Sequence, residues 1–271
     1  MTSLLVTALF AFTALAYLAA SVVFAAKIAG RDVAPAVDRA GMWALVAGGL
    51  AHLAHVVLWS LVLRVCPVEG IYFPLSFGAN LMVGVFFVLR RRYRLDALGS
   101  VVAPMALATL MASRFAVAGT APSEEVTGTL LPFHIMANLL GVALFTLAAA
   151  ASLLYLVQEG RLKSKKLGAV SRLPPLDKLD RVGHRLLIAG FPLLTVGVVT
   201  GSLFLHRMVS ESNAVLIRSA LGYLTWLLIA VVLVLRQAAG WRGRRAALGT
   251  LVGFGLTVSV LAFYAWRGVG G

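Results

Sequence analysis

Cysteine is nearly absent from this sequence, and acidic residues are few. The single cysteine, Cys66, cannot form an intrachain disulfide, and without a CxxC pair the chain has neither a thiol shuttle nor a zinc-thiolate site. The sequence also shows no Ser-His-Asp order, phosphate-binding loop or cluster of metal ligands. We therefore predict that the protein is not an enzyme.

Charged residues make up only 13% of the 271 residues, whereas 61% are hydrophobic and the mean hydropathy is +0.94. Water-soluble domains do not have this composition. A net charge of +14 would suit a nucleic-acid binder, but the basic residues form short runs between long apolar stretches. The run from Arg90 to Arg94, directly after such a stretch, is typical of a helix end held at anionic lipid. We expect the lipid bilayer as a partner, and no nucleic acid.

Apolar segments long enough to cross about 30 Å of hydrocarbon recur along the chain. They predict an all-α, polytopic integral membrane protein with about eight transmembrane helices in one domain, residues 1–271. The first segment lacks a preceding basic region and is expected to be a retained helix, not a cleaved signal. The segments lie near 3–26, 41–63, 74–89, 97–118, 131–157, 186–206, 214–235 and 246–266.

The distribution of Lys and Arg predicts the orientation, because short cytoplasmic loops carry their excess. Assigning alternate loops to one side places nineteen of the 24 basic residues together, against five on the other side. Both termini are then extracytoplasmic. The longest connection, 158–185, contains Pro174-Pro175 and is expected to be a cytoplasmic linker between five helices and three.

Five histidines are the candidate functional residues, since ionisable groups at membrane depth are costly. His52 and His55 lie three residues apart on one face of the second helix. His134 opens the fifth helix, and His184 and His206 lie at the two ends of the sixth.

Two histidines at one depth on different helices can supply both axial ligands of a haem. His134 and His206, both expected at the extracytoplasmic surface, meet that requirement and are the predicted ligands of the haem iron. His55, or His52, has only His184 as a partner, at a poorer match of depth. The alternative is that these histidines form ordinary interfacial or interhelical hydrogen bonds. Asn138, one turn after His134, could orient its ring, and Arg114 could pair with a haem propionate or extend to the interface.

Five segments have the pattern of one known family. They are Ala51-His52-Leu53-Ala54-His55, Phe73-Pro74-Leu75-Ser76, the stretch from His134 to Leu156, the stretch from Leu179-Asp180 through Gly190-Phe191-Pro192 to Gly201, and Gly240-Trp241-Arg242-Gly243-Arg244-Arg245. Over nearly its full length the chain resembles the cytochrome c assembly protein superfamily, which includes CcsA, ResC and HemX-like membrane proteins. The short HemX- and YpjD-like branch is the most similar.

This resemblance implies haem handling in a bacterial cytoplasmic (inner) membrane, with haem b as the expected cofactor. His134 resembles the family's first extracytoplasmic haem histidine, and His55, or less closely His52, its first transmembrane one. The tryptophan-rich loop of full-length members should follow Gly201 but is absent, and Val234 stands where a second transmembrane histidine is expected.

Two functions are therefore open. The first is a haem-binding protein that assists cytochrome c maturation or haem handling, with other maturation proteins as partners. The second is a HemX-like regulator or scaffold linked to haem biosynthesis through glutamyl-tRNA reductase, which does not transport haem.

Overall fold

The computed structural model describes residues 2–63, 72–115, 130–164, 173–208 and 213–269, without the side chains at some helix ends. These residues form eight α-helices and one short 3-10 helix, and no strand occurs among them. The prediction of an all-α, multi-pass membrane protein is confirmed. The helices are α1 (Thr2–Ile28), α2 (Pro35–Leu63), α3 (Tyr72–Tyr93), η1 (Asp96–Leu98), α4 (Gly99–Phe115), α5 (Leu130–Lys163), α7 (Leu176–Met208), α8 (Asn213–Ala238) and α9 (Arg244–Val269).

Seven of these helices are both long enough and apolar enough to span a membrane, counted over the described residues. The eighth, α9, has 26 residues and begins with the basic pair Arg244 and Arg245. About 20 helical residues suffice to cross the hydrocarbon layer, so α9 also has the required length. All eight helices expected from the sequence are present.

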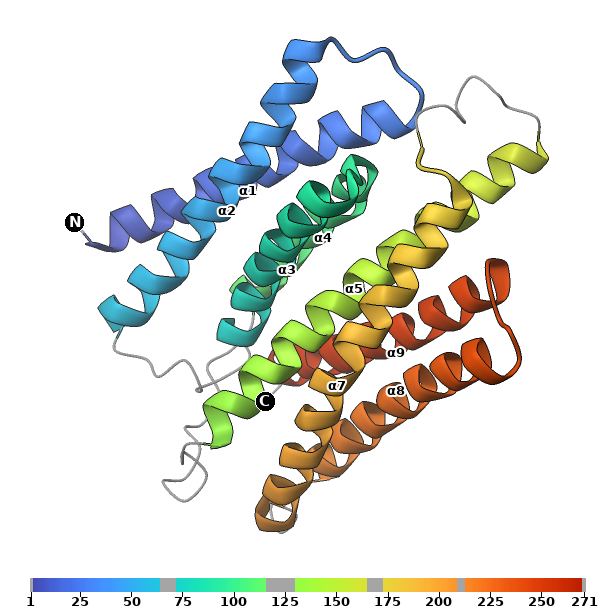
Figure 1. Cartoon of the computed structure of the whole chain (residues 1–271). Helices are drawn as coiled ribbons and strands as arrows, with labels where there is room; N and C mark the ends of the chain where they lie inside the picture. Colours follow the sequence, from blue (N-terminus) through green and yellow to red (C-terminus); the bar gives the residue numbers. More distant parts are fainter. Residues whose placement is uncertain (1, 64–71, 116–129, 165–172, 209–212, 270–271) are drawn as a thin grey trace.

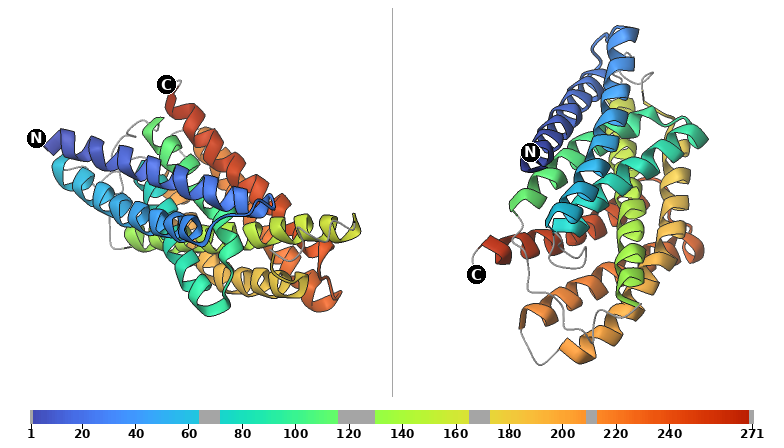
Figure 2. Two further views of the ribbon diagram at one scale, coloured as in Figure 1. Left: turned by 90° about the horizontal axis from the view of Figure 1, so that it is seen from above. Right: turned by 90° about the vertical axis from the view of Figure 1, so that its left-hand side faces the viewer.

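The helices run up and down between two ends of an elongated bundle (Figure 1). Helix α5 is central: it packs against α7 along most of its length and also contacts α3 and α9. Helices α1 and α2 pack together and join the bundle through α4 and α3, while α8 and α9 form the opposite flank (Figures 1 and 2). The C-terminal ends of α1, α3, α5 and α8 lie at the end of the bundle that carries most of the basic residues.

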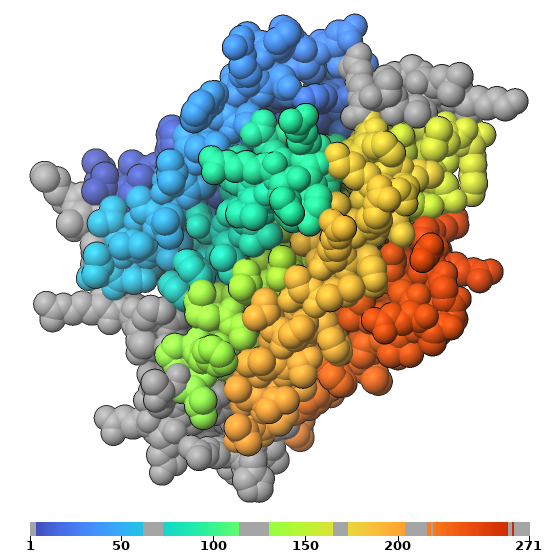
Figure 3. All heavy atoms as spheres, in the orientation of Figure 1, coloured from blue at the N-terminus to red at the C-terminus, as the bar shows by residue number. Residues whose placement is uncertain are grey.

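Large apolar side chains lie exposed on the outside of the bundle, as a lipid environment requires. Three examples are Leu4, which is 76% exposed, Trp43 at 70% and Leu61 at 69%. Figure 3 shows one face of this surface, across which α7 runs. The core contains many small side chains instead, including the run Ala148–Ala151 of α5, whose members are at most 2% exposed. Lipid is as apolar as leucine, so close packing of small residues is what favours helix association here.

The connection expected at 158–185 is shorter in the structure, because α5 continues to Lys163 and α7 begins at Leu176. Charged side chains extend both helices beyond the apolar spans. Glu159 and Lys163 are 3.0 Å apart, and Asp177 and Arg181 are 2.7 Å apart, each pair at the i,i+4 spacing that stabilises a helix. Hydropathy marks the point at which the chain leaves the hydrocarbon. A helix can continue beyond that point, as α5 and α7 do here.

The predicted orientation can be tested with reporter fusions after Ser164 and after Gly271. The excess of basic residues at the end containing Ser164 predicts that this end is cytoplasmic. An alkaline phosphatase fusion is expected to be active after Gly271 and inactive after Ser164, and a cytoplasmic fluorescent reporter should give the reverse pattern. Equal activity of the two fusions with either reporter would contradict the topology.

Candidate functional site

His52 of α2 is fully buried and uses both ring nitrogens. Nδ1 lies 3.1 Å from the Tyr17 hydroxyl of α1, and Nε2 lies 2.8 Å from Oγ of Ser76 on α3. Tyr17, His52 and Ser76 are each 0% exposed. This histidine therefore joins three helices through satisfied polar contacts, the role that buried polar groups commonly have between membrane helices.

His55, one turn farther along α2, is held differently. Its Nδ1 donates to the backbone carbonyl of Val6 on α1 over 3.0 Å, and its ring lies against Phe10 and Trp59 at centroid distances of 5.5 and 6.0 Å. A carbonyl can only accept, so the proton of a neutral ring is on Nδ1 and the lone pair is on Nε2. That tautomer is the one a metal-ligating histidine needs.

His134 of α5 contacts a hydroxyl of the neighbouring helix. Its Nδ1 lies 2.8 Å from Oγ1 of Thr200 on α7, and the same Oγ1 lies 2.7 Å from the Val196 carbonyl oxygen. When the hydroxyl donates its single proton to that carbonyl, it accepts from Nδ1–H, and the lone pair of a neutral ring is then on Nε2. Hydrogen bonds that fix the ring in this way are typical of histidines that bind metals.

Asn138 and two glycines of α7 complete the surroundings of His134. Nδ2 of Asn138 donates to the His134 carbonyl over 2.9 Å and lies 3.3 Å from both ring nitrogens. A Cβ at Gly197 would approach Oδ1 of Asn138 to 2.3 Å, and one at Gly201 would approach the His134 ring to 3.1 Å. The two glycines thus make the space that these polar side chains occupy between α5 and α7.

His206, the expected partner of His134, is on the last turn of α7, and its side chain lies outside the described part of the structure, as does that of Arg114. His134 is level with Thr200 and Gly201, five residues before His206. At 1.5 Å per residue this is about 8 Å along the helix axis. The two histidines are therefore offset in depth where the sequence suggested equal depth, and their pairing stays a prediction.

His184, the expected partner of His55 or His52, lies far from His55. It projects from α7 into a small cavity between α5, α7, α8 and α9, near the basic end of the bundle. Its Nδ1 is buried and has no hydrogen-bond partner within the described part of the chain. His55 lies between α1 and α2, so the structure does not bring these two histidines together.

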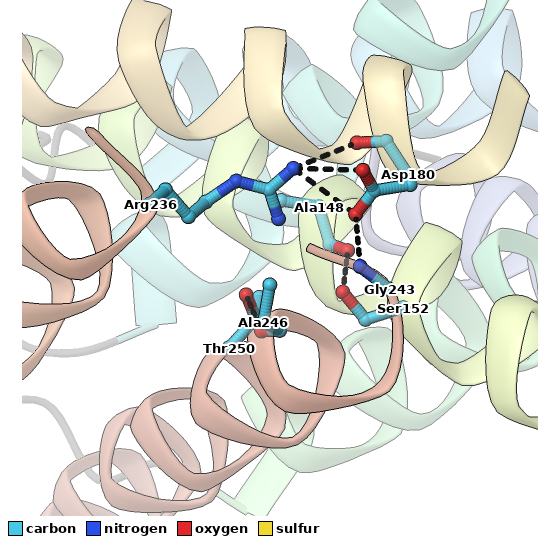
Figure 4. A network of polar contacts seen from close by, with 7 residues as sticks. All are labelled: Ala148, Ser152, Asp180, Arg236, Gly243, Ala246 and Thr250. Atoms are coloured by element: carbon cyan, nitrogen blue, oxygen red, sulfur yellow. Dashed lines mark hydrogen bonds and ion pairs between the residues drawn. The ribbon is translucent and has the colours of Figure 1, made fainter. Parts of the chain in front are cut away.

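Beside His184 is an ion pair that the sequence analysis did not identify (Figure 4). Nη2 of Arg236 on α8 lies 3.0 Å from each carboxylate oxygen of Asp180 on α7, and the two side chains are only 7% and 15% exposed. Oδ1 of Asp180 also accepts the backbone N–H of Gly243 over 3.2 Å. One carboxylate thereby links α7, α8 and the turn that precedes α9.

Gly243 fits this site because of its backbone and its lack of a side chain. Its φ is +60°, a region that favours glycine, and a Cβ there would approach the Tyr155 hydroxyl of α5 to 2.6 Å. Tyr155, Asp180 and Gly243 come from three of the segments that carry the family resemblance. Hydropathy assigned Asp180 to the linker, so its burial could only have been inferred from its place in that pattern.

Replacing Asp180→Asn tests the importance of this buried pair. The substitution leaves the charge of Arg236 buried without its counter-ion, which typically costs about 3–5 kcal/mol of folding free energy. Thermal unfolding of the purified protein in detergent should show a clear fall in Tm.

The matched control is Asp177→Asn, one turn earlier on α7. Asp177 and Arg181 form an exposed pair, with side-chain exposures of 71% and 63%, and such pairs contribute little. Equal Tm values for the two variants would show that the buried pair is not important for stability.

Comparison with known proteins agrees with the family resemblance found in the sequence. A family model described as "Cytochrome C assembly protein" matches residues 68–270. The chain is 35% identical to the cytochrome c biogenesis protein CcsA of Synechococcus elongatus over 88 residues, which are 32% of this chain and 27% of that protein. It is 29% identical to the inner membrane protein YpjD of Escherichia coli over 163 residues, 60% of this chain and 58% of the relative.

A third relative is CcsA of Chlamydomonas reinhardtii, 24% identical over 200 residues, which are 69% of this chain and 55% of that protein. The matched regions thus span between 27% and 58% of the length of these relatives. No solved structure matches the chain.

Proposed function

Since the chain belongs to the cytochrome c assembly protein family, we propose that it binds haem in the membrane and assists cytochrome c maturation or haem handling. Two of the relatives are named as cytochrome c biogenesis proteins and one as an inner membrane protein, so we place this chain in a bacterial cytoplasmic membrane. The proposed role is binding and handling of haem b and not catalysis.

The observation that supports this proposal most is the setting of His134. Haem iron accepts a neutral imidazole nitrogen, and a Thr200 hydroxyl that donates to the Val196 carbonyl accepts from Nδ1–H and leaves the lone pair on Nε2. The Asn138 amide, 3.3 Å from Nε2, would move aside for the iron. Glycines opposite the ring keep α7 from crowding it. The donor chemistry at His134 thus fits one axial ligand, and His206 is the proposed second.

Each nearby residue has a defined task in this proposal. Thr200 holds the proton on Nδ1, which fixes the ring and makes Nε2 more basic. Asn138 lies between the ring and Gly197 and limits rotation of the imidazole. Haem would supply the iron and the redox-active macrocycle, while these residues supply the ligand and its orientation.

For the second site we propose His55, whose Nδ1–H contact to Val6 gives it the same tautomer. His52, which contacts Tyr17 on α1 and Ser76 on α3, is the weaker candidate because it resembles the family's first transmembrane haem histidine less closely. His184, the remaining candidate, lies in a different part of the bundle, so an inner site would use His55 without it.

The outer site is tested by the absorption spectrum of protein purified after expression with excess haem. Wild-type protein should show the low-spin features of a bis-histidine haem, and His134→Ala or His206→Ala should each remove them. If both variants keep the wild-type spectrum, the outer pair is incorrect. If the wild-type protein takes up no haem under any of these conditions, the regulatory or scaffold role is the better proposal.

A subtler variant tests how His134 is held. Thr200→Val keeps the size of the side chain but removes the acceptor for Nδ1–H, and loss of such a partner typically lowers affinity by about 10–100-fold. Titration with haem should show that loss. Thr225→Val on α8 is the control, because the hydroxyl of Thr225 donates only to its own helix at the Leu221 carbonyl. Equal haem affinities in the two variants would exclude a role for Thr200 in positioning His134.

Substitution of His55 should affect a separate haem population. We expect His55→Ala to remove part of the bound haem and to leave the low-spin outer component unchanged, because the Val6 and Thr200 contacts are on different helices. Leu53→Ala, on a more exposed face of α2, should change little. A stoichiometry of one haem per chain that His55→Ala does not alter would limit the protein to one site.

A further inference from the structure

An open cleft of about 260 Å³ lies at the basic end of the bundle, where three separate parts of the chain meet. It is bounded by the last turn of α1, the connection between α3 and α4, and the first turn of α7. Phe24, Ile28 and Leu173 give it an apolar wall, and Lys27, Arg94 and Lys178 give it positive charge. Neither the histidines nor the ion pair of Asp180 belongs to this cleft.

The charges around the cleft do not cancel. Lys27 pairs with Asp38 at 2.7 Å, and the one acidic residue among those lining the cleft, Asp96, pairs with Arg90. Within the described residues, no carboxylate lies within ion-pair distance of Arg94 or Lys178. Two cations therefore remain available to a ligand at this site.

Two helices begin beside the cleft, but their backbone groups are already bonded. The cleft includes Ala97 of η1, Ser100 in the first turn of α4, and Lys178 in the first turn of α7. The Gly99 N–H donates to the Ala97 and Asp96 carbonyls, and the Lys178 N–H donates to the Pro175 carbonyl. The attraction for an anion therefore comes from the side chains of Arg94 and Lys178.

The apolar wall indicates what kind of anion would bind. Phe24 and Leu173 are only 2% and 6% exposed, so they form part of the inner wall of the cleft. The site also lies where the spans end, at the level of lipid headgroups if the bundle spans the bilayer. An amphiphile with a phosphate head and an apolar tail matches both halves of the cleft.

We propose that this cleft is a binding site for the headgroup phosphate of an anionic phospholipid. Arg94 and Lys178 contact the phosphate, and an acyl chain follows the apolar wall toward the bilayer. Basic pockets between membrane helices bind anionic headgroups in this way. The site is independent of haem binding.

The experiment is native mass spectrometry of the full-length protein released from nanodiscs that contain phosphatidylglycerol and phosphatidylcholine in equal amounts. Wild-type protein should retain phosphatidylglycerol preferentially. The double variant Arg94→Gln/Lys178→Gln should lose about ten-fold or more of that preference, because each cation near the surface contributes to binding of anionic lipid. The control is Arg91→Gln/Arg92→Gln, which removes the same charge from exposed residues outside the cleft.

A second variant, Ala97→Leu, fills part of the cleft without changing any charge and should also reduce lipid retention. Thermal melting of each variant shows whether it is folded. Equal losses in the two double variants would mean that overall charge, and not this cleft, attracts the lipid. Displacement of the lipid by millimolar inorganic phosphate would reassign the site to free phosphate. Either result, or unchanged retention in the folded variants of the cleft, would overturn the proposal.

Discussion

Helices α5 and α7 pack closely against each other, and α5 also contacts α3 on one side and α9 on the other. Helix α7 has a glycine every seven residues, at Gly183, Gly190 and Gly197. All three therefore face the same neighbour, α5. A Cβ at Gly190 would lie 3.3 Å from the Gly141 carbonyl of α5, and one at Gly197 would collide with Asn138. Because helices in lipid gain little from burying apolar surface against each other, this short distance is what makes the interface favourable.

Polar side chains of the bundle are placed so that they stabilise this packing. Several hydroxyls, including those of Ser152 and Thr250, donate to a carbonyl one turn earlier in their own helix, which satisfies them without a partner elsewhere. Others connect helices, as Tyr17 and Ser76 do through His52. Unsatisfied polar groups are costly in hydrocarbon, so each of these contacts restricts how the neighbouring helices can shift.

The two ends of the bundle differ in chemistry, and this asymmetry matches the proposed activities. One end has the buried pair of Asp180 and Arg236, the cavity beside His184 and the basic cleft. The other end has His134 between glycines of α7, with few charged residues nearby. Helices α5 and α7 run between both ends. The packed pair would therefore connect the proposed lipid site at the first end with the proposed haem ligand at the second.

The helical membrane fold was predictable from the sequence, since long apolar runs leave the chain no other way to satisfy its backbone in lipid. The family resemblance also singled out His134 and His55 as candidate haem ligands, and these assignments stay predictions. Only the packing of the helices shows that Thr200 lies against His134, that His52 joins α1 and α3, and that Asp180 is buried against Arg236. Hydropathy reports how deep a residue lies along one helix. It does not report which neighbouring helix that residue faces, and the chemistry of each histidine depends on that neighbour.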